Sequence, residues 1–525
     1  MSKRHLSRRQ FLHAAGGTLV VGVGYALRRQ LSIPADSRGR ALALNAAAAG
    51  PLAQDGSQPL ITQGTLHIPP LLTPTVQGAS QAFALTMAPG ETELLPGRQT
   101  PTFGFNGGYL GPTIRVPMGQ QVQLAVANQL GEPTTVHWHG MHLPPTMDGG
   151  PHQVILPGEI WRPAWTVSQP AATLWYHPHL MGATREQVIR GLVGMFIVED
   201  AHPVQALLPH TYGVDDLPLI LQDVVIGANG DLNLGGGRGG GGTSLTLLNG
   251  SSGPWFETPA RRVRLRLLNA SAQRFYTLSL ASGQTFLQIA SDGGLLSAAV
   301  PLTRTVLAPA ERMEIVIDLS SEAPTVLQTT PANNGGRGGA GNQPVGLLTL
   351  STSDEWPASV ALPPALNQID RIDPARADVV RDMVLARGGR AFTINGASMQ
   401  TMDDMMNVDG AMRVHLGDTE LWRVINNSGA AHVFHVHDVQ FQILDRNGAP
   451  PSAQEAGWKD TVVVRPNETV RIMMTFADFA DLDHPYMYHC HLLNHEDAGM
   501  MGQFLVVPRA ADSTPTSSPH DGMTM

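Results

Sequence analysis

The chain is poor in cysteine, in charge and in long hydrophobic runs. It has a single cysteine in 525 residues, which excludes a disulfide within the chain. Charged residues make up 15%, and the net charge of -9 arises without a long run of one sign. That balance argues against a nucleic-acid partner, which needs a basic surface. Beyond the N-terminal region no apolar stretch approaches the roughly 20 residues that span a bilayer, so we expect no stable membrane anchor.

The N-terminal region has the pattern of an export signal. It begins with the basic residues Lys3, Arg4, Arg8 and Arg9, and residues 7–12 contain a twin-arginine motif. The apolar part that follows is too short to span a bilayer, and small residues near its end offer cleavage sites. We predict a twin-arginine signal peptide over residues 1–48, read by the twin-arginine export machinery. The protein would then be periplasmic or extracellular; the alternative is an arginine-rich disordered tail.

Glycine and proline are abundant, with 56 and 40 residues, which suits an all-β protein with many turns. Three stretches, 119–128, 262–269 and 417–426, alternate apolar and polar residues and each end in asparagine. Period-two alternation indicates a strand with one buried face. We predict three related β domains over 55–200, 201–355 and 365–510, each using this strand equivalently.

The rest of the chain carries weaker signals. Short helices are predicted at 184–192 and within 366–385. Two glycine-rich tracts, near 227–250 and 331–341, are predicted to be surface loops of the middle domain, because they lack the lysine and the strand-to-helix setting of a phosphate-binding loop. The Ser/Thr/Pro-rich tail, 511–525, is predicted to be disordered.

The only cysteine lies among metal-ligating side chains. Cys490 is flanked by His489 and His491, with His495 and Met500 following. A cysteine, two histidines and a weak axial methionine form the ligand set of a blue-copper site, for which this stretch lacks one histidine. In a strand Cys490 would face away from its two neighbours, whose Cα atoms would lie about 7 Å apart and could serve two adjacent metal ions. The alternative is a buried structural cysteine.

Four clusters of paired histidines occur in the chain and use ten of its 20 histidines. They are His137 and His139; His177 and His179; His432, His435 and His437; and His489, His491 and His495. The first two clusters lie in the first predicted domain and the last two in the third. A shared metal site must therefore form where these two domains meet, and the middle domain would act as a spacer.

The order and spacing of these clusters resemble those of the multicopper oxidases over about residues 60–510. The resemblance is greatest to the bacterial laccase and cuprous-oxidase branch, through Asp148-Gly149-Gly150, residues 456–460 and residues 489–501. It implies three cupredoxin-like Greek-key β-sandwich domains and four copper ions per chain. The implied blue-copper ligands are His432, Cys490, His495 and Met500; a single normal copper takes His137 and His435; a coupled pair takes His139, His177, His179, His437, His489 and His491.

The resemblance further implies a laccase-like oxidase. One-electron donors, phenols or aromatic amines, would be oxidised at the blue centre, and dioxygen would be reduced by four electrons to water at a trinuclear cluster. Electrons would leave the Cys490 sulfur through His489 and His491. Asp148 and Glu496 match carboxylates that deliver protons in the family; the alternative for each is a solvated loop charge.

Two alternatives stay open. The first is a periplasmic cuprous oxidase in copper tolerance. Such enzymes place Asp and Met before the His432 cluster, where this chain has Ser428-Gly429-Ala430-Ala431. A methionine-rich stretch, 399–412, with Asp403 and Asp404 could bind Cu(I) through thioethers or could simply fill a core. The second alternative is a non-enzymatic exported copper-binding cupredoxin.

Overall fold

The computed structural model describes residues 64–234, 242–319, 323–331, 343–353, 361–389 and 391–509. These residues belong to one compact unit that begins at Pro59. The predicted signal peptide, residues 235–241 of the first glycine-rich tract, residues 332–341 of the second and the C-terminal tail lie outside the described residues. Within the first tract the prediction of a surface loop is wrong for Thr243–Leu248, which forms strand β12. Among those described, no helix is long and apolar enough to cross a membrane.

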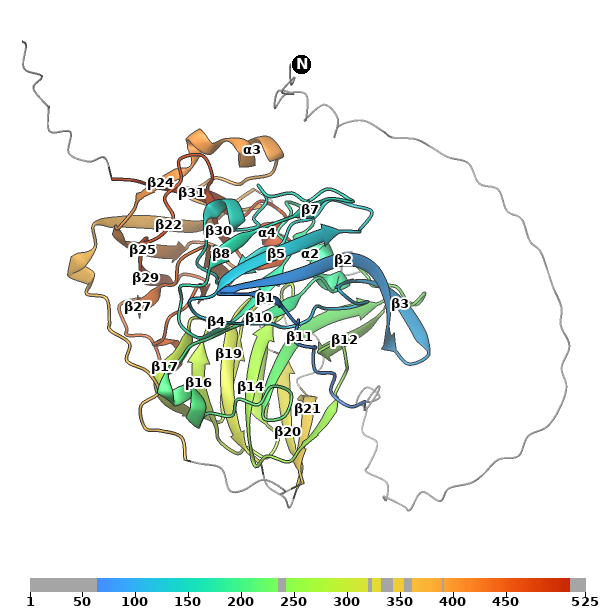
Figure 1. Ribbon diagram of the computed structural model, residues 1–525. Coiled ribbons are helices and arrows are strands. Elements are labelled where there is room, and N and C mark those ends of the chain that lie inside the picture. Colours follow the sequence, from blue (N-terminus) through green and yellow to red (C-terminus); the bar gives the residue numbers. More distant parts are fainter. Residues whose placement is uncertain are drawn as a thin grey trace, which may run out of the picture. The chain divides into compact units, whose positions relative to one another are not determined.

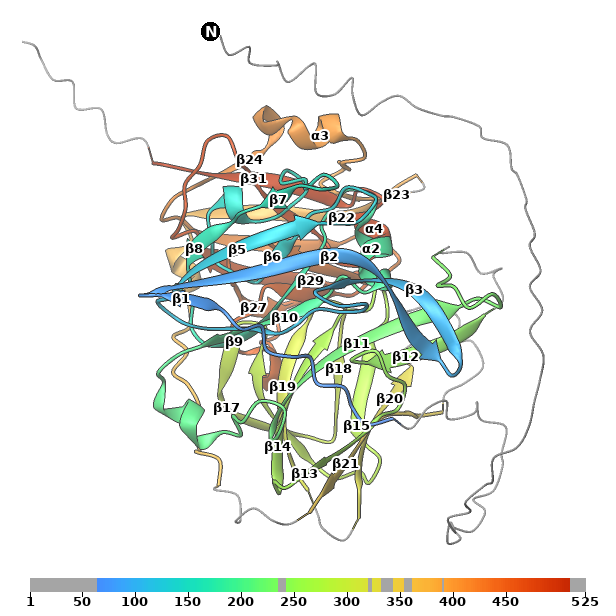
Figure 2. The same ribbon diagram turned by 45° about the vertical axis from the view of Figure 1, so that its right-hand side comes forward.

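In the part of the chain that the structure describes, the strands form six sheets, two in each third. Figures 1 and 2 show their arrangement. Between residues 75 and 199, one sheet contains β1 (Thr75–Gln77), β2 (Ser80–Leu95), β3 (Arg98–Phe105), β5 (Gln121–Asn128), β7 (Ile160–Trp161) and β8 (Ala164–Thr166). The other contains β4 (Ile114–Pro117), β6 (His137–His139), β9 (Ala172–His177) and β10 (Gly194–Glu199). Buried side chains of both sheets, among them Leu85, Val126 and Tyr176, share one core.

The strands between residues 216 and 352 lie together, green to yellow in Figures 1 and 2. One sheet contains β11 (Asp216–Ile226), β12 (Thr243–Leu248), β14 (Arg262–Asn269), β16 (Phe286–Ser291), β17 (Gly294–Leu302) and β19 (Arg312–Asp318). The other contains β13 (Trp255–Thr258), β15 (Tyr276–Leu280), β18 (Arg304–Leu307), β20 (Thr325–Pro331) and β21 (Val345–Thr352).

The last third of the chain repeats this plan. One sheet contains β22 (Val379–Gly388), β23 (Ala391–Ile394), β25 (Thr419–Asn426), β27 (Gln442–Arg446) and β29 (Thr469–Thr475). The other contains β24 (Met412–His415), β26 (His432–Val436), β28 (Thr461–Val464), β30 (Tyr486–Cys490) and β31 (Met501–Val507). The core between them includes Trp422, Phe434 and Cys490. The exact limits of the three predicted domains stay a prediction.

The three similar stretches occupy equivalent strands, which explains their likeness. Strands β5, β14 and β25 each pair in parallel with an earlier strand, β2, β11 and β22 respectively. Each ends in a fully buried asparagine, Asn128, Asn269 or Asn426. Each asparagine donates two side-chain hydrogen bonds to backbone carbonyls and accepts one from the amide two residues later. The asparagine therefore fastens the turn that follows the strand in all three places.

Helices are short in the described part of the chain. They are α2 (Thr184–Arg190), α3 (Met402–Met406) and α4 (Leu493–Glu496). The prediction of a helix near 184–192 is confirmed by α2. Part of 366–385 was also predicted to be helical; the structure has only a short 3₁₀ helix there, Pro374–Arg376, and Val379–Gly388 forms strand β22. Its parallel pairing with β25 outweighs the helical spacing of its valines.

Candidate metal centre

Strand pairing brings the histidine clusters together two by two. In the first third of the chain, β6 lies antiparallel to β9 and His137 faces His177. In the last third, β26 lies antiparallel to β30 and His435 faces His489. Alternate residues of a strand share a face, so His137 and His139 project to the same side. All ten paired histidines are buried except His495, which is half-buried.

Cys490 and two histidines form one compact ligand group. The Cys490 Sγ lies 3.5 Å from the Nδ1 of His432 and 3.5 Å from the Nδ1 of His495. These three atoms lie within 4.8 Å of one another. Met500 is buried in the same core, and its carbonyl accepts a hydrogen bond from the Cys490 amide at 3.0 Å. The structure thus places beside Cys490 the second histidine that the 489–501 stretch lacks.

The other eight histidines form a second group from both ends of the chain. Ligand atoms of His137, His139 and His177 lie within 4.8 Å of one another, as do those of His137, His435 and His437. The Nε2 of His489 lies 3.1 Å from that of His179 and 3.2 Å from that of His437. Two facing imidazole nitrogens at that distance suit a shared metal ion. His491 lies among them, with ring centroids 5.0 Å from His139 and 5.2 Å from His177.

Outward hydrogen bonds fix which nitrogen each imidazole presents inward. His137, His435 and His177 each use Nδ1 to donate to a backbone carbonyl, of Asp148, Asp460 and Pro178, at 2.8–2.9 Å. Their Nε2 atoms are buried without a hydrogen-bond partner. His139 is reversed: its Nε2 faces Asp460 at 3.2 Å, and its buried Nδ1 has no partner. A buried unpartnered nitrogen is costly unless a metal takes it, and metal-ligating histidines commonly bond outward in this way.

The two predicted carboxylates touch these imidazoles. Asp148 is buried, and its Oδ2 accepts a hydrogen bond from His437 Nδ1 at 2.8 Å. Glu496 is also buried, with Oε2 3.2 Å from His489 Nδ1 and Oε1 3.7 Å from His179 Nδ1. Neither is a solvated loop charge, although their proton-transfer roles stay a prediction.

Burial disfavours the protonated form of several of these imidazoles. It lowers the pKa of His179 and His491 to about 3, that of His432 to about 3 and that of His495 to about 4. The same loss of hydration raises the pKa of the Cys490 thiol to about 12. Neutral imidazole is the ligand form that copper needs, and a bound metal displaces a thiol proton outright. The donor set of imidazole, thiolate and thioether fits copper.

Three residues beside the site had no role assigned from the sequence. The Ser428 hydroxyl lies 2.7 Å from His432 Nε2 and occupies the position discussed for a cuprous oxidase. The Phe392 ring lies 4.4 Å from the His495 ring and 4.8 Å from the His432 ring. Asp460 contacts His139 and His435, and the only sequence signal for it is its place in the stretch 456–460.

The methionine-rich stretch is partly core. Met399 and Met405 pack with Met487 and Met501 in a buried cluster, whereas Met406 is exposed. Asp404 accepts from the Thr401 amide at 2.9 Å and caps α3. Core packing therefore accounts for Met399 and Met405.

Comparison with known proteins agrees with this copper-binding, all-β architecture. Two family models described as multicopper oxidase match residues 86–203 and 376–510. "Multicopper oxidase mco" of Staphylococcus aureus is 35% identical over 81% of this chain and 88% of that protein. "Cell division protein FtsP" of Sodalis glossinidius is 34% identical over 96% and 99%. The crystal structure of a laccase from Pediococcus acidilactici Pa5930 superposes with a TM-score of 0.76 at 35% identity, covering 85% of this chain and 94% of that one.

The chain belongs to the multicopper oxidase family. Its fold is accordingly three cupredoxin-like β-sandwiches, as the repeated pairs of sheets display. Membership implies copper as the cofactor.

Proposed function

We propose that the protein is a laccase-like oxidase that holds four copper ions and couples one-electron oxidation of phenols or aromatic amines to reduction of dioxygen to water. The observation that carries the proposal is the convergence of the sole cysteine and ten histidines into two adjacent ligand groups. Every family ligand position is filled. Copper at these positions supplies the capacity to store four electrons and to reduce dioxygen without releasing partly reduced oxygen.

The chain connects the two groups by its own covalent structure. Cys490 belongs to the first group, whereas its direct neighbours His489 and His491 belong to the second. One peptide unit on either side of Cys490 therefore links the first group, where the electron donor would be oxidised, to the second group, where dioxygen would be reduced. Asp148 and Glu496 hold the outer nitrogens of second-group histidines and are placed to hand on protons.

The surroundings of His495 favour an aromatic donor. His495 is the one half-buried ligand of its group, so a donor reaches that group most readily there. Phe392, partly exposed on β23, covers both imidazoles, and the Arg387 guanidinium lies 5.7 Å from the Phe392 ring centroid. An aromatic ring can stack on this surface. We therefore place phenols and aromatic amines ahead of metal-ion donors.

Copper content and oxygen uptake test the proposal. The purified protein should bind about four copper ions, show a copper–thiolate blue band and consume oxygen with a phenol. One copper ion and no oxygen uptake would instead support an exported copper carrier. Phenol, Mn(II) and Cu(I) compared at matched concentration identify the donor class. Faster turnover with Cu(I) than with any phenol would favour a periplasmic cuprous oxidase in copper tolerance.

A second candidate function comes from the relatives named cell division protein, which match nearly the whole chain. Such a role would be structural and would not require oxygen chemistry. The buried unpartnered nitrogens described above favour the oxidase, because a purely structural role gives them no partner. A variant that binds no copper and still restores division in cells that lack the wild-type protein would support the second candidate.

We further propose that the protein is exported by the twin-arginine route. Fractionation of cells in which Arg8 and Arg9 are replaced by lysine tests this.

A further inference from the structure

A buried arginine from the middle third of the chain reaches toward the second histidine group. Arg312 begins strand β19, and its side chain is fully buried. Its Nη1 donates to Asp460 Oδ1 at 2.7 Å, and its Nη2 donates to the other carboxylate oxygen. Two parallel bonds of this kind fix both the distance and the plane of a carboxylate.

Asp460 in turn contacts two imidazoles with different proposed copper assignments. Its Oδ1 lies 3.2 Å from His139 Nε2, and its backbone carbonyl lies 2.8 Å from His435 Nδ1. The two rings stack with centroids 3.8 Å apart and an interplanar angle of 10°. Thr461 completes the arrangement by donating its hydroxyl to Asp460 Oδ1 at 2.9 Å. The position of Asp460 thus sets the orientation of both rings.

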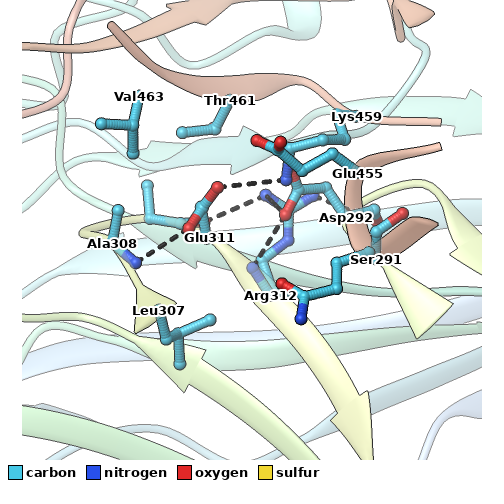
Figure 3. Close-up of polar contacts among 12 residues, drawn as sticks. Ser291, Asp292, Leu307, Ala308, Glu311, Arg312, Glu455, Lys459, Thr461 and Val463 are labelled. Carbon is cyan, nitrogen blue, oxygen red and sulfur yellow. Dashed lines mark hydrogen bonds and ion pairs between the residues drawn. The ribbon is translucent and has the colours of Figure 1, made fainter. Parts of the chain in front are cut away.

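Other contacts hold Arg312 in place. Its Nε donates to the Thr173 carbonyl on β9 at 3.0 Å, and its Nη2 to the Asp292 carbonyl at 3.2 Å. Figure 3 shows the Arg312 guanidinium beside Asp292, which Lys459 approaches from the other side, with Nζ 2.9 Å from Asp292 Oδ2. Lys459 also lies 3.2 Å from Glu311. Arg312 therefore joins all three thirds of the chain at one point.

The backbone next to His139 packs closely against this ion pair. A Cβ on Gly140 would lie 2.7 Å from Asp460 Oδ2 and 2.8 Å from Arg312 Nη2. Gly140 also has a φ of +85°, which glycine adopts without strain. The segment carrying His139 therefore has no room for a side chain at position 140, beside Arg312 and Asp460.

Stability alone is a weak explanation for such a pair. Removing two charges from water opposes folding, and well-packed apolar side chains often serve stability as well. We propose that Arg312 is a positioning residue that holds Asp460 against His139 and His435 and thereby orients these imidazoles toward copper. This inference rests on the proposed function. It makes the middle domain part of the site, where the sequence predicted only a spacer.

Copper retention in Arg312→Met and Arg312→Lys tests the proposal. Loss of a residue that orients metal ligands typically weakens metal binding about 10- to 100-fold. We expect copper affinity to fall by that factor in Arg312→Met, measured by competition with a chelator. The EPR hyperfine splitting of the single normal (type-2) copper, assigned to His137 and His435, should also change. The blue absorbance of the Cys490 group should persist. Arg312→Lys, which keeps the charge without the two-pronged bond, should lie between Met and wild type.

The matched control is Arg264→Met. Arg264 is as deeply buried in the same third of the chain and is paired with Glu314, which bonds to Arg266 and Thr173. It should lower the thermal midpoint of copper-free protein without changing copper affinity or the EPR spectrum. Wild-type affinity and EPR in both Arg312 variants would overturn the inference; if the Met variant does not fold, the Lys variant decides alone. Wild-type protein without cluster copper would instead refute the proposed function before any variant is made.

Discussion

At the scale of single residues, Asp148 makes the clearest prediction about proton delivery. Its Oδ2 bonds to His437, while its Oδ1 is buried without a hydrogen-bond partner and lies 3.3 Å from His137 Nδ1. We expect Asp148→Asn to slow turnover about 10²- to 10⁴-fold, the usual contribution of a proton-transfer group, and to leave the blue absorbance intact. Oxygen uptake measured across pH checks this. Unchanged turnover at every pH would remove Asp148 from the mechanism.

Phe392 makes a second prediction at this scale, concerning the donor. Replacing it with leucine removes the ring that covers His432 and His495 but keeps an apolar side chain. We expect KM for a phenol to rise several-fold, because stacking contributes about 0.5–1.5 kcal/mol. KM for ferrocyanide, which has no ring to stack, serves as the control and should change less. Equal changes for both donors would show that Phe392 does not select aromatic donors.

At the scale of elements, the three buried asparagines predict where loss of a turn affects the site. Asn426→Ala removes hydrogen bonds to the Ala430 and Val464 carbonyls and to the Ser428 amide. Leaving such buried groups unpaired costs about 1–3 kcal/mol each. Because this turn carries Ser428 and leads into His432, we expect a lower thermal midpoint and a weaker blue band.

The equivalent asparagine of the middle third provides the control. Asn269→Ala removes the same set of bonds at a turn that carries no copper ligand. It should lower the thermal midpoint comparably and leave the blue band unchanged. Equal loss of the blue band in both variants would mean that the turn before His432 has no particular part in holding the copper group.

At this scale the sequence was informative where the pattern is local. Alternation with a terminal asparagine marked β5, β14 and β25, because a half-buried strand needs that period and the buried turn needs that side chain. Periodicity was misleading for β22, where it predicted a helix. Val379, Val380, Met383 and Val384 recur at a helical spacing, yet the parallel edge of β25 pairs with this segment as a strand. That partner is distant in the chain and invisible to local periodicity.

At the scale of the whole molecule, burying so many histidines makes stability depend on pH. The pKa values of His179, His432, His491 and His495 are lowered to about 3 or 4 by burial, whereas unfolded histidine titrates near 6.5. Below pH 6.5 the unfolded chain therefore binds more protons than the folded one, and stability falls as pH decreases. Burial alone would raise the pKa of Glu314, but the charges of Arg264 and Arg266 outweigh burial and lower this pKa to about 2. Glu314 therefore contributes a loss of stability only below about pH 4.5.

The thermal midpoint of copper-free protein checks this dependence. We expect it to decrease steadily from pH 7 to pH 5, a range in which histidines titrate and carboxylates largely do not. Copper should raise the midpoint at pH 7, and by less at pH 5, because protons compete for the same nitrogens. A midpoint that stays constant between pH 7 and pH 5 would contradict the burial of neutral imidazoles.

The site itself was predictable to the extent that its residues are paired in sequence. The four histidine clusters and Cys490 stood out because copper needs those side chains and strands present them at spacing two. Arg312 gave no such signal, since its partner Asp460 lies 148 residues away and nothing around it resembles a motif. The contacts of Ser428 and Phe392 with His432 were equally unpredictable, because they form only in the folded chain.

The proposed function requires the Cys490 thiolate to collect single electrons and pass them to the imidazoles beside it. Replacing Cys490 with serine, a side chain of similar size that does not form the copper–thiolate bond, tests this most directly. The variant should retain the fold by circular dichroism, lose the blue absorbance and cease to consume oxygen with a phenol. Oxygen consumption by the colourless variant at the wild-type rate would contradict the account.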